Sequence, residues 1–405
     1  MPDDVPAALA DVVKRERLLV VASLIRVFGD WDLADDVFAE ATERALRRWP
    51  VDGIPANPGA WLTTTARRRA IDVVRRRAVE SGKLAEVAMQ ESRETGETPD
   101  IADDRLRLMF TCCHPALPLD ARVALTLRVV AGLPTVAVGR AFLVSEQTIG
   151  KRLQRAKQKI ANAHIPYRVP TEQTLPERLD GVLTVVYLIF TEGWAGNADP
   201  ALADEAIRLG RLLLELLPGS DEARALLALM LVQHARRDAR TVGGDLVTLE
   251  EQDRTRWDAD AIREALALLA APVQERGSYR IQAEIAAVHA SAPRADRTDW
   301  PAIVAGYDEL FRMQPSPVVA LNRAVAIGMA DGPHAGLAVL DELAGDARLS
   351  GYHPLHAARG ELLARAGQPA EAVIELARAA ELAPTAQEQT QIRRRLASLR
   401  PGGSE

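Results

Sequence analysis

The chain has 405 residues, of which 26% are charged and 4% are aromatic, and its formal net charge is −6. Two adjacent cysteines are too few for a disulfide framework, and the acidic first residues lack the plan of a signal peptide. The longest apolar run, Val182–Phe190, is too short to span a bilayer. We therefore expect a cytoplasmic protein of two or three domains with no membrane partner.

Hydrophobic patterning indicates an all-α fold, because almost no stretch alternates apolar and polar residues and Ala, Leu and Arg are abundant. The charge is unevenly divided. Residues 1–165 hold 25 basic and 22 acidic side chains, a net charge of +3, whereas the remainder holds 25 and 34, a net charge of −9. A polyanion would be attracted to the first part and repelled by the second.

The first domain, expected at residues 8–79, contains three helices. The first covers residues 8–28 and ends at Gly29-Asp30. The second covers residues 33–49. One face of this second helix is apolar, and the other is acidic. The acidic residues are Asp32, Asp35, Asp36, Glu40 and Glu43. Taken alone, such a face is typical of a solvated surface.

A third helix is expected over residues 60–77, after a loop at 50–59 in which Asn57 is the N-cap. Its apolar half includes Leu62, Ala66 and Ala70. The opposite half carries four arginines, Arg68, Arg69, Arg75 and Arg76, which form a phosphate-binding stripe unless they are simply a solvated basic face. For the tryptophans, core packing is favoured for Trp61 and left open for Trp49.

Residues 80–104 are expected to be an acidic linker, because eight acidic side chains face two basic ones and helical periodicity is weak. A small helical domain is then expected at 105–165. It contains Cys112, Cys113 and His114, for which we favour ordinary helix packing over a metal or redox site, since adjacent cysteines serve one tetrahedral site poorly.

The end of this domain, Leu133–Ile160, reads as a helix-turn-helix. A break at residues 143–145 precedes a helix capped by Ser145. Its apolar seam is formed by Ile149, Leu153, Ala156 and Ile160, and its outward side carries Gln147, Lys151, Gln154, Arg155 and Gln158, flanked by Arg152 and Lys159. This division is what a DNA-recognition helix needs to read base edges in the major groove, although a solvated amphipathic helix has the same pattern.

Residues 176–400 are expected to form a series of helix pairs. The clearest pair, at 354–384, has Gly360, Ala372 and Ala379 at the small-residue positions of a tetratricopeptide unit, although Leu376 stands where that repeat has an aromatic residue. Such arrays bind proteins or peptides on concave surfaces. We find no nucleotide-binding, hydrolase or metalloprotease motif, so we expect neither an enzyme nor a cofactor nor a metal site.

The order of these parts resembles the extracytoplasmic-function group of the sigma-70 superfamily of transcription initiation factors. Residues 32–45 (DLADDVFAEATERA) look like the helix of region 2.2, and residues 61–72 (WLTTTARRRAID) look like regions 2.3 and 2.4. The helix-turn-helix resembles region 4.2. Residues 108–117 (LMFTCCHPAL), 164–170 (HIPYRVP) and 187–194 (YLIFTEGW) resemble a subgroup with a long tetratricopeptide-like extension.

The resemblance implies a sigma factor that binds core RNA polymerase and promoter DNA. Polymerase would contact Asp32, Asp35, Asp36 and Glu40. Residues 50–58 would receive a flipped base of the −10 element, with the arginine stripe on nearby phosphates. The −35 element would be read by Gln147, Thr148, Lys151, Arg152 and Arg155. Gly150, inside the recognition helix, departs from the family pattern. Glycine at such a position costs about 1 kcal/mol against alanine, and it leaves room for closer approach to DNA.

Two other functions stay open on the sequence alone. A conventional DNA-binding regulator with a sensing repeat domain would bind DNA without polymerase, and a repeat-protein scaffold would bind neither. For the sigma factor, we expect the C-terminal array to regulate or support activity by binding a regulatory protein or peptide. Its net charge of −9 suggests one mechanism, in which the array covers the basic DNA-binding faces.

Overall fold

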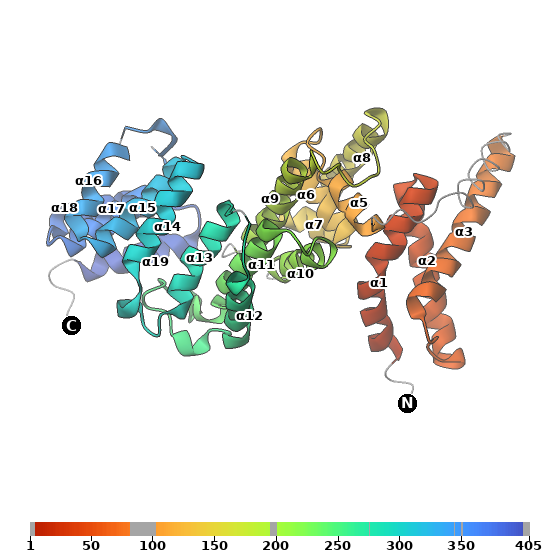
Figure 1. Cartoon of the computed structure of the whole chain (residues 1–405), viewed down its shortest axis with the longest axis horizontal. Helices are drawn as coiled ribbons and strands as arrows, with labels where there is room; N and C mark the ends of the chain where they lie inside the picture. The colour runs from red at the N-terminus through yellow and green to blue at the C-terminus, as the bar shows by residue number, and fades with distance from the viewer. Residues whose placement is uncertain are drawn as a thin grey trace. The chain divides into compact units, whose positions relative to one another are not determined.

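Figure 1 shows the computed structural model of the chain, which describes residues 5–81, 103–194, 201–274, 276–343, 345–349 and 351–399. Within these residues the only strands, β1 (Thr241–Val242) and β2 (Asp245–Leu246), form one short hairpin, so the all-α prediction is confirmed. Most of the expected acidic linker, residues 82–102, lies outside the described residues. Contacts divide the chain into two compact units, Met1–Glu192 and Gly193–Glu405.

The first unit contains two groups of helices. The first group is α1 (Val5–Phe28), α2 (Trp31–Asp52) and α3 (Pro58–Ser81). The second group is α5 (Asp104–Cys112), α6 (Leu119–Leu125), the π-helical turn η1 (Thr126–Val130), α7 (Thr135–Ala141), α8 (Glu146–Asn162) and α9 (Leu175–Trp194). No described helix is long and apolar enough to cross a membrane.

Helices α1, α2 and α3 pack against one another as a small bundle. The break between α1 and α2 is made by Gly29, whose φ of +66° is readily adopted only by glycine, and by Asp30, whose carboxylate caps the Asp32 and Leu33 amides. The predicted apolar face of α2 is buried, as is that of α3 along Leu62, Ala66 and Ala70. These two seams form the bundle core.

The loop expected at residues 50–59 is shorter than predicted. Helix α2 continues through Pro50 to Asp52, and the Gly53 amide closes its last turn by donating to the Trp49 carbonyl at 3.0 Å. Proline normally ends a helix because it lacks an N–H and crowds the preceding turn. Here the helix nonetheless continues for one short turn beyond Trp49, which is itself buried. Asn57 caps α3 as expected, since its side chain accepts from the Ala60 amide at 2.9 Å.

Helices α7 and α8 form the predicted helix-turn-helix. Ser145 caps α8 by accepting from the Thr148 amide at 3.2 Å, and the four seam residues of α8 are all buried, which confirms both expectations. Leu143, in the turn, has a φ of +52°. Cys112 and Cys113 are buried free thiols in the domain core, where burial raises the pKa of Cys113 to about 11, so the packing interpretation is confirmed.

The second unit is a succession of helices. They are α10 (Ala201–Leu216), α11 (Asp221–His234), α12 (Ala259–Ala270), α13 (Ser278–Ser291), α14 (Trp300–Met313), α15 (Pro317–Ala330), α16 (Pro333–Leu343), α17 (His353–Arg365), α18 (Pro369–Leu382) and α19 (Ala386–Ser398). Short 3₁₀ turns η2 (Arg237–Ala239), η3 (Arg254–Arg256), η4 (Ala295–Arg297) and η5 (Ala347–Leu349) lie between them. Successive helices such as α14 and α15, α15 and α16, and α17 and α18 pack against each other as pairs.

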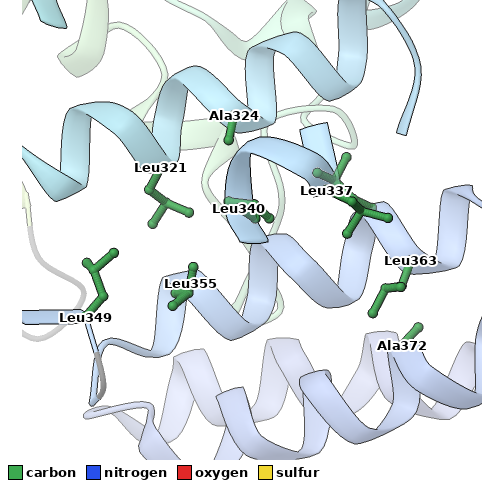
Figure 2. Packing of buried hydrophobic residues seen from close by; sticks show 9 residues of the cluster. Leu321, Ala324, Leu337, Leu340, Leu349, Leu355, Leu363 and Ala372 are labelled. Atoms are coloured by element: carbon green, nitrogen blue, oxygen red, sulfur yellow. The ribbon is translucent and has the colours of Figure 1, made fainter. Parts of the chain in front are cut away.

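The core of the last pairs is built from leucines with small residues between them (Figure 2). Leu321 of α15, Leu340 of α16 and Leu355 of α17 meet in one buried cluster. Gly360 lets α17 approach α18 closely, because a Cβ there would lie 2.7 Å from the Leu376 side chain. Ala372 and Ala379 are fully buried. Gly360 and Ala372 therefore lie where the two helices of the predicted pair meet, and Ala379 belongs to the cluster that α18 shares with α19.

Candidate nucleic-acid interface

A hollow of about 190 Å³ lies between α2 and α3, on the face away from the bundle core. It is lined by Glu40, Ala41, Arg44, Arg48, Trp61, Thr65, Arg68, Arg69 and Asp72. Four of these nine side chains are guanidinium groups, and one is an indole. This combination suits a nucleic-acid strand, because guanidinium groups bind phosphates and an aromatic ring stacks on an unpaired base.

Three of the arginines are free to bind a ligand. Arg44, Arg48 and Arg68 are exposed, and none of them forms an ion pair with a residue that the structure describes. Arg69 differs, because its guanidinium donates to the Glu40 carboxylate, which raises the pKa of Arg69. A predicted polymerase contact, Glu40, is thus paired with a predicted phosphate contact.

The predicted arginine stripe is only partly gathered at this hollow. Arg68 and Arg69 line it, whereas Arg75 and Arg76 lie further along α3 and are exposed. The sequence analysis missed Arg44 and Arg48. Their signal was present, since they continue the Asp36–Glu40 face of α2 at intervals of four residues, but that face was read as acidic throughout.

The structure decides the position of Trp49, which the sequence left open, and places Trp61, for which core packing was favoured, nearer the surface. Trp49 is only 2% exposed and belongs to the core, whereas Trp61 is half-buried and lines the hollow. Their rings meet edge to face with centroids 5.6 Å apart. Core packing of Trp61 is therefore only partial, since one side of the ring packs on Trp49 while part of the side chain stays exposed at the hollow. Trp61 therefore presents ring surface to the hollow.

The acidic residues of α2 do not form one free surface. The Asp35 carboxylate, 15% exposed, binds Arg17 of α1 at 2.7 Å and Arg128 of η1 at 3.0 Å. Asp32 binds Lys157 of α8 at 2.6 Å. Asp36 is exposed and has no ion-pair partner among the described residues. Two of the four predicted polymerase contacts therefore connect the three-helix bundle to the helix-turn-helix domain.

The π-helical turn η1 carries much of this connection. It presents the Arg128 side chain, and its Val129 carbonyl accepts from Arg17 at 2.8 Å. Arg17 thereby joins α1, α2 and η1. Two further contacts support the joint: Arg26 binds Asp104 at 3.0 Å, and the Tyr167 hydroxyl donates to the Ala22 carbonyl at 2.9 Å. The two groups of helices are held together by paired charges and partly buried hydrogen bonds.

The outward face of α8 is largely available. Gln147, Lys151 and Arg155 are exposed and make no ion pair within the described part of the chain. Thr148 is exposed, but its hydroxyl lies 2.9 Å from the capping Ser145 hydroxyl. Arg152 is half-buried because it binds Asp120 at 3.3 Å and lies over the Phe142 ring at 5.1 Å. Among the predicted base contacts, Arg152 is therefore held most firmly by its own domain.

A groove of about 550 Å³ runs beside this helix. Its basic wall consists of Arg152, Arg155 and Lys159, and its other wall is the segment 116–121. The sequence analysis placed Lys159 at the flank of the helix and did not choose it as a contact. Gly150 lies on the outward side, and a Cβ added there would meet nothing within 4 Å.

Comparisons with known families agree with this arrangement. Residues 12–79 match sigma-70 region 2, and residues 107–160 match sigma-70 region 4. Residues 178–272 match a family of unknown function (DUF6596). The chain is also 44% identical over 394 residues to the Rhizobium meliloti (strain 1021) protein named "Uncharacterized protein R00370", with 94% of this chain and 93% of that protein covered.

Proposed function

We propose that the chain is an extracytoplasmic-function sigma factor acting in the cytoplasm, because it carries regions 2 and 4 of the sigma-70 family of transcription initiation factors, which are not enzymes. Its family implies that it binds core RNA polymerase and promoter DNA. The observation that carries our proposal is the pairing of two basic sites on one chain. The first is the arginine-lined hollow of region 2, and the second is the outward face of α8 in region 4.

In this proposal the hollow takes one strand of the opened −10 element. Arg44, Arg48 and Arg68 bind its phosphates, and Trp61 stacks on a base that has left the duplex. Extracting a base costs a few kcal/mol, so a phosphate anchor and a stacking surface must act together. The sequence analysis assigned the flipped base to residues 50–58, which now include the last turn of α2. Arg75 and Arg76 extend the phosphate track along α3.

Helix α8 reads the −35 element through Gln147, Lys151 and Arg155, with Thr148 at its N-terminus. These side chains reach base edges in the major groove, while Lys159 binds the adjacent phosphate backbone. Arg152 has a supporting role in this scheme, because its guanidinium is already bound to Asp120.

Core polymerase docks on the exposed end of α2 around Asp36. Asp32 joins this docking surface when Lys157 releases it, since the Asp32 side chain is otherwise exposed. Asp35 and Glu40 act inside the molecule, through Arg17, Arg128 and Arg69. Polymerase binding would then compete with the contacts that hold region 4 against region 2.

The second unit is proposed to be an atypical tetratricopeptide-like array that regulates or supports initiation by binding a regulatory protein or peptide. Its support is the series of helix pairs with Gly360, Ala372 and Ala379 at close helix contacts. The net charge of −9 after residue 165 favours masking of the basic sites as the mode of regulation.

Run-off transcription tests the proposed function. Bacterial core polymerase is added to genomic promoter fragments with and without the full-length chain. Discrete transcripts that require the chain support a sigma factor, and their upstream sequences define both promoter elements. Failure to bind core polymerase, or to create any start site, with both the full chain and residues 1–192 would sink the proposal.

A further inference from the structure

A cluster of arginines and tryptophans lies in the second unit, far along the chain from the promoter-binding helices. We call it the arginine–tryptophan cluster and define it as Trp194, Arg236, Arg240, Arg254 and Trp257. Two guanidinium groups share one indole: Arg240 lies 4.2 Å and Arg236 lies 5.8 Å from the centre of the Trp194 ring. Arg254 lies 4.5 Å from the centre of the Trp257 ring.

The backbone fixes these groups close together. Arg240 donates to the Trp194 carbonyl, and Arg254 donates to the His289 and Ala292 carbonyls at 2.6 Å each. The Asp258 amide donates to the Ala235 carbonyl at 2.9 Å, which holds Trp257 beside Arg236. The three charges are therefore held near one another by contacts that neutralise none of them.

Among the residues that the structure describes, no carboxylate forms an ion pair with these three guanidinium groups. The Arg236 guanidinium also makes no hydrogen bond in the described ranges. Burial lowers the pKa of Arg240, and the nearby Glu388 only partly opposes this shift; the Glu388 carboxylate itself accepts from the Thr385 amide and hydroxyl in a capping box and forms no ion pair with Arg240. Buried charges in proteins are normally paired, so an unbalanced group of this kind is unusual.

Two further observations point to a missing anion. Burial, together with Arg240 and Arg254, lowers the pKa of Arg236 to about 10, and burial beside Arg236 and Arg254 lowers the pKa of His289 to about 4. His289 is therefore neutral at physiological pH and adds no charge. The Trp257 indole N–H is buried without a hydrogen-bond partner among the described residues. The cluster therefore offers an unused hydrogen-bond donor in addition to its positive charge.

We propose that the arginine–tryptophan cluster is an oxyanion-binding site that takes a phosphate or carboxylate group. Guanidinium groups match both anions through paired N–H donors, and Trp194 holds two of them in position by stacking. Arg236 is the principal ligand, because its guanidinium is the one with no other bond. The proposal does not depend on promoter binding, since every residue of the cluster belongs to the second unit.

Isothermal titration calorimetry on the full-length chain, in a chloride buffer free of other oxyanions, tests this site. Inorganic phosphate and succinate are titrated separately. We expect saturable binding with a Kd below about 1 mM for at least one of them. Phosphate alone would identify a phosphate site, and succinate alone a carboxylate site. No saturable heat from either anion up to about 10 mM would overturn the proposal.

Variants locate the binding. Arg236→Gln should weaken it at least about tenfold, whereas Arg312→Gln, which removes an exposed arginine without an ion pair in the described structure, should leave it unchanged. Unchanged binding in Arg236→Gln and in Arg240→Gln would place the anion elsewhere and overturn the proposal.

Thermal unfolding separates ligand binding from a structural role. The bound anion should raise the midpoint of the native chain by about 3 °C at saturation. Arg236→Gln should raise the anion-free midpoint, because it removes like-charge repulsion, and should abolish the anion-dependent rise. A lowered anion-free midpoint, together with an undiminished rise on adding anion, would contradict the assignment.

Discussion

At the scale of single residues, the helix-turn-helix contains a leucine where the backbone favours glycine. Leu143 has a φ of +52° and a side chain that is 94% exposed, so its conformation is strained and its burial contributes nothing in return. Leu143→Gly should therefore raise the free energy of unfolding by about 1 kcal/mol, as measured by urea denaturation. Leu143→Ala is the matched control, because alanine keeps the strain, and it should give no gain. A less stable glycine variant would show that Leu143 makes a stabilising contact.

Gly150 presents the opposite case, since its backbone is helical and an added Cβ would meet no atom within 4 Å. Gly150→Ala should stabilise the chain by about 1 kcal/mol in the same denaturation experiment. It should also weaken binding of the holoenzyme to the −35 element about tenfold, because the added methyl group lies between Gln147 and Lys151 on the DNA-facing side. Unchanged −35 affinity would mean that DNA does not approach this position.

At single residues, prediction succeeded where spacing within one helix decides the outcome, and it failed where packing between two helices decides it. The α8 seam and the Ser145 cap follow from simple spacing and were predicted correctly. Trp49 and Trp61 both continue apolar faces, and spacing cannot decide which indole a neighbouring helix covers. Arg44 and Arg48 were overlooked because their partners in the hollow, Arg68 and Trp61, come from another helix.

At the scale of elements, two adjacent acidic residues of α2 have separate roles. Asp35 lies between Arg17 and Arg128, whereas Asp36 is exposed. Asp35→Asn should lower the free energy of unfolding by about 2 kcal/mol, because two partly buried guanidinium groups lose their carboxylate.

Asp36→Asn is its control and should change stability by less than about 0.5 kcal/mol while weakening the affinity for core polymerase. Thermal denaturation and a core-polymerase binding assay distinguish these effects. If Asp35→Asn is as stable as the native chain, the ion pairs seen around Asp35 do not hold the two regions together.

The elements themselves were predicted well except where tertiary contacts override local preference. Helix-start signals at Asn57 and Ser145 depend only on neighbouring residues, and both are present in the structure. The extension of α2 through Pro50 has no such local signal, since proline normally ends a helix. The π-helical turn η1 has no sequence signal of its own, and its function in the fold becomes evident only when Arg17 and Asp35 are placed against it.

At the scale of the whole molecule, the regulatory proposal is tested by removing the second unit. Helix α9 packs on region 4, where Arg178 donates to the Phe110 carbonyl at 2.8 Å, so a cut near residue 170 would uncover that core. Residues 1–192 are therefore the suitable fragment. If the array masks the basic sites, this fragment should bind promoter DNA more tightly than the full chain. The difference in affinity should be largest at low salt. Equal or weaker binding would exclude masking, and lost transcription would indicate a supporting role.

The all-α class and the order of the sigma regions could be read from the sequence because they depend on periodicity and on local motifs. The ion pairs of Asp32 with Lys157 and of Asp35 with Arg128 could not be predicted, since the partners are about 100 residues apart along the chain. The arginine–tryptophan cluster was hidden for the same reason, as its members come from three separate segments between residues 194 and 257.

Promoter opening is the most direct measurement of the central claim, that the region 2 hollow holds one strand of the opened −10 element. Once transcripts have defined the promoter, 2-aminopurine is placed at each −10 position, and its fluorescence is followed as holoenzyme is added. We predict a rise at one position with the native chain and its loss with Arg44→Gln/Arg68→Gln. It should persist with Arg47→Gln, a control arginine that is paired with Glu43 on the same helix. An equal rise with the double variant would contradict the account.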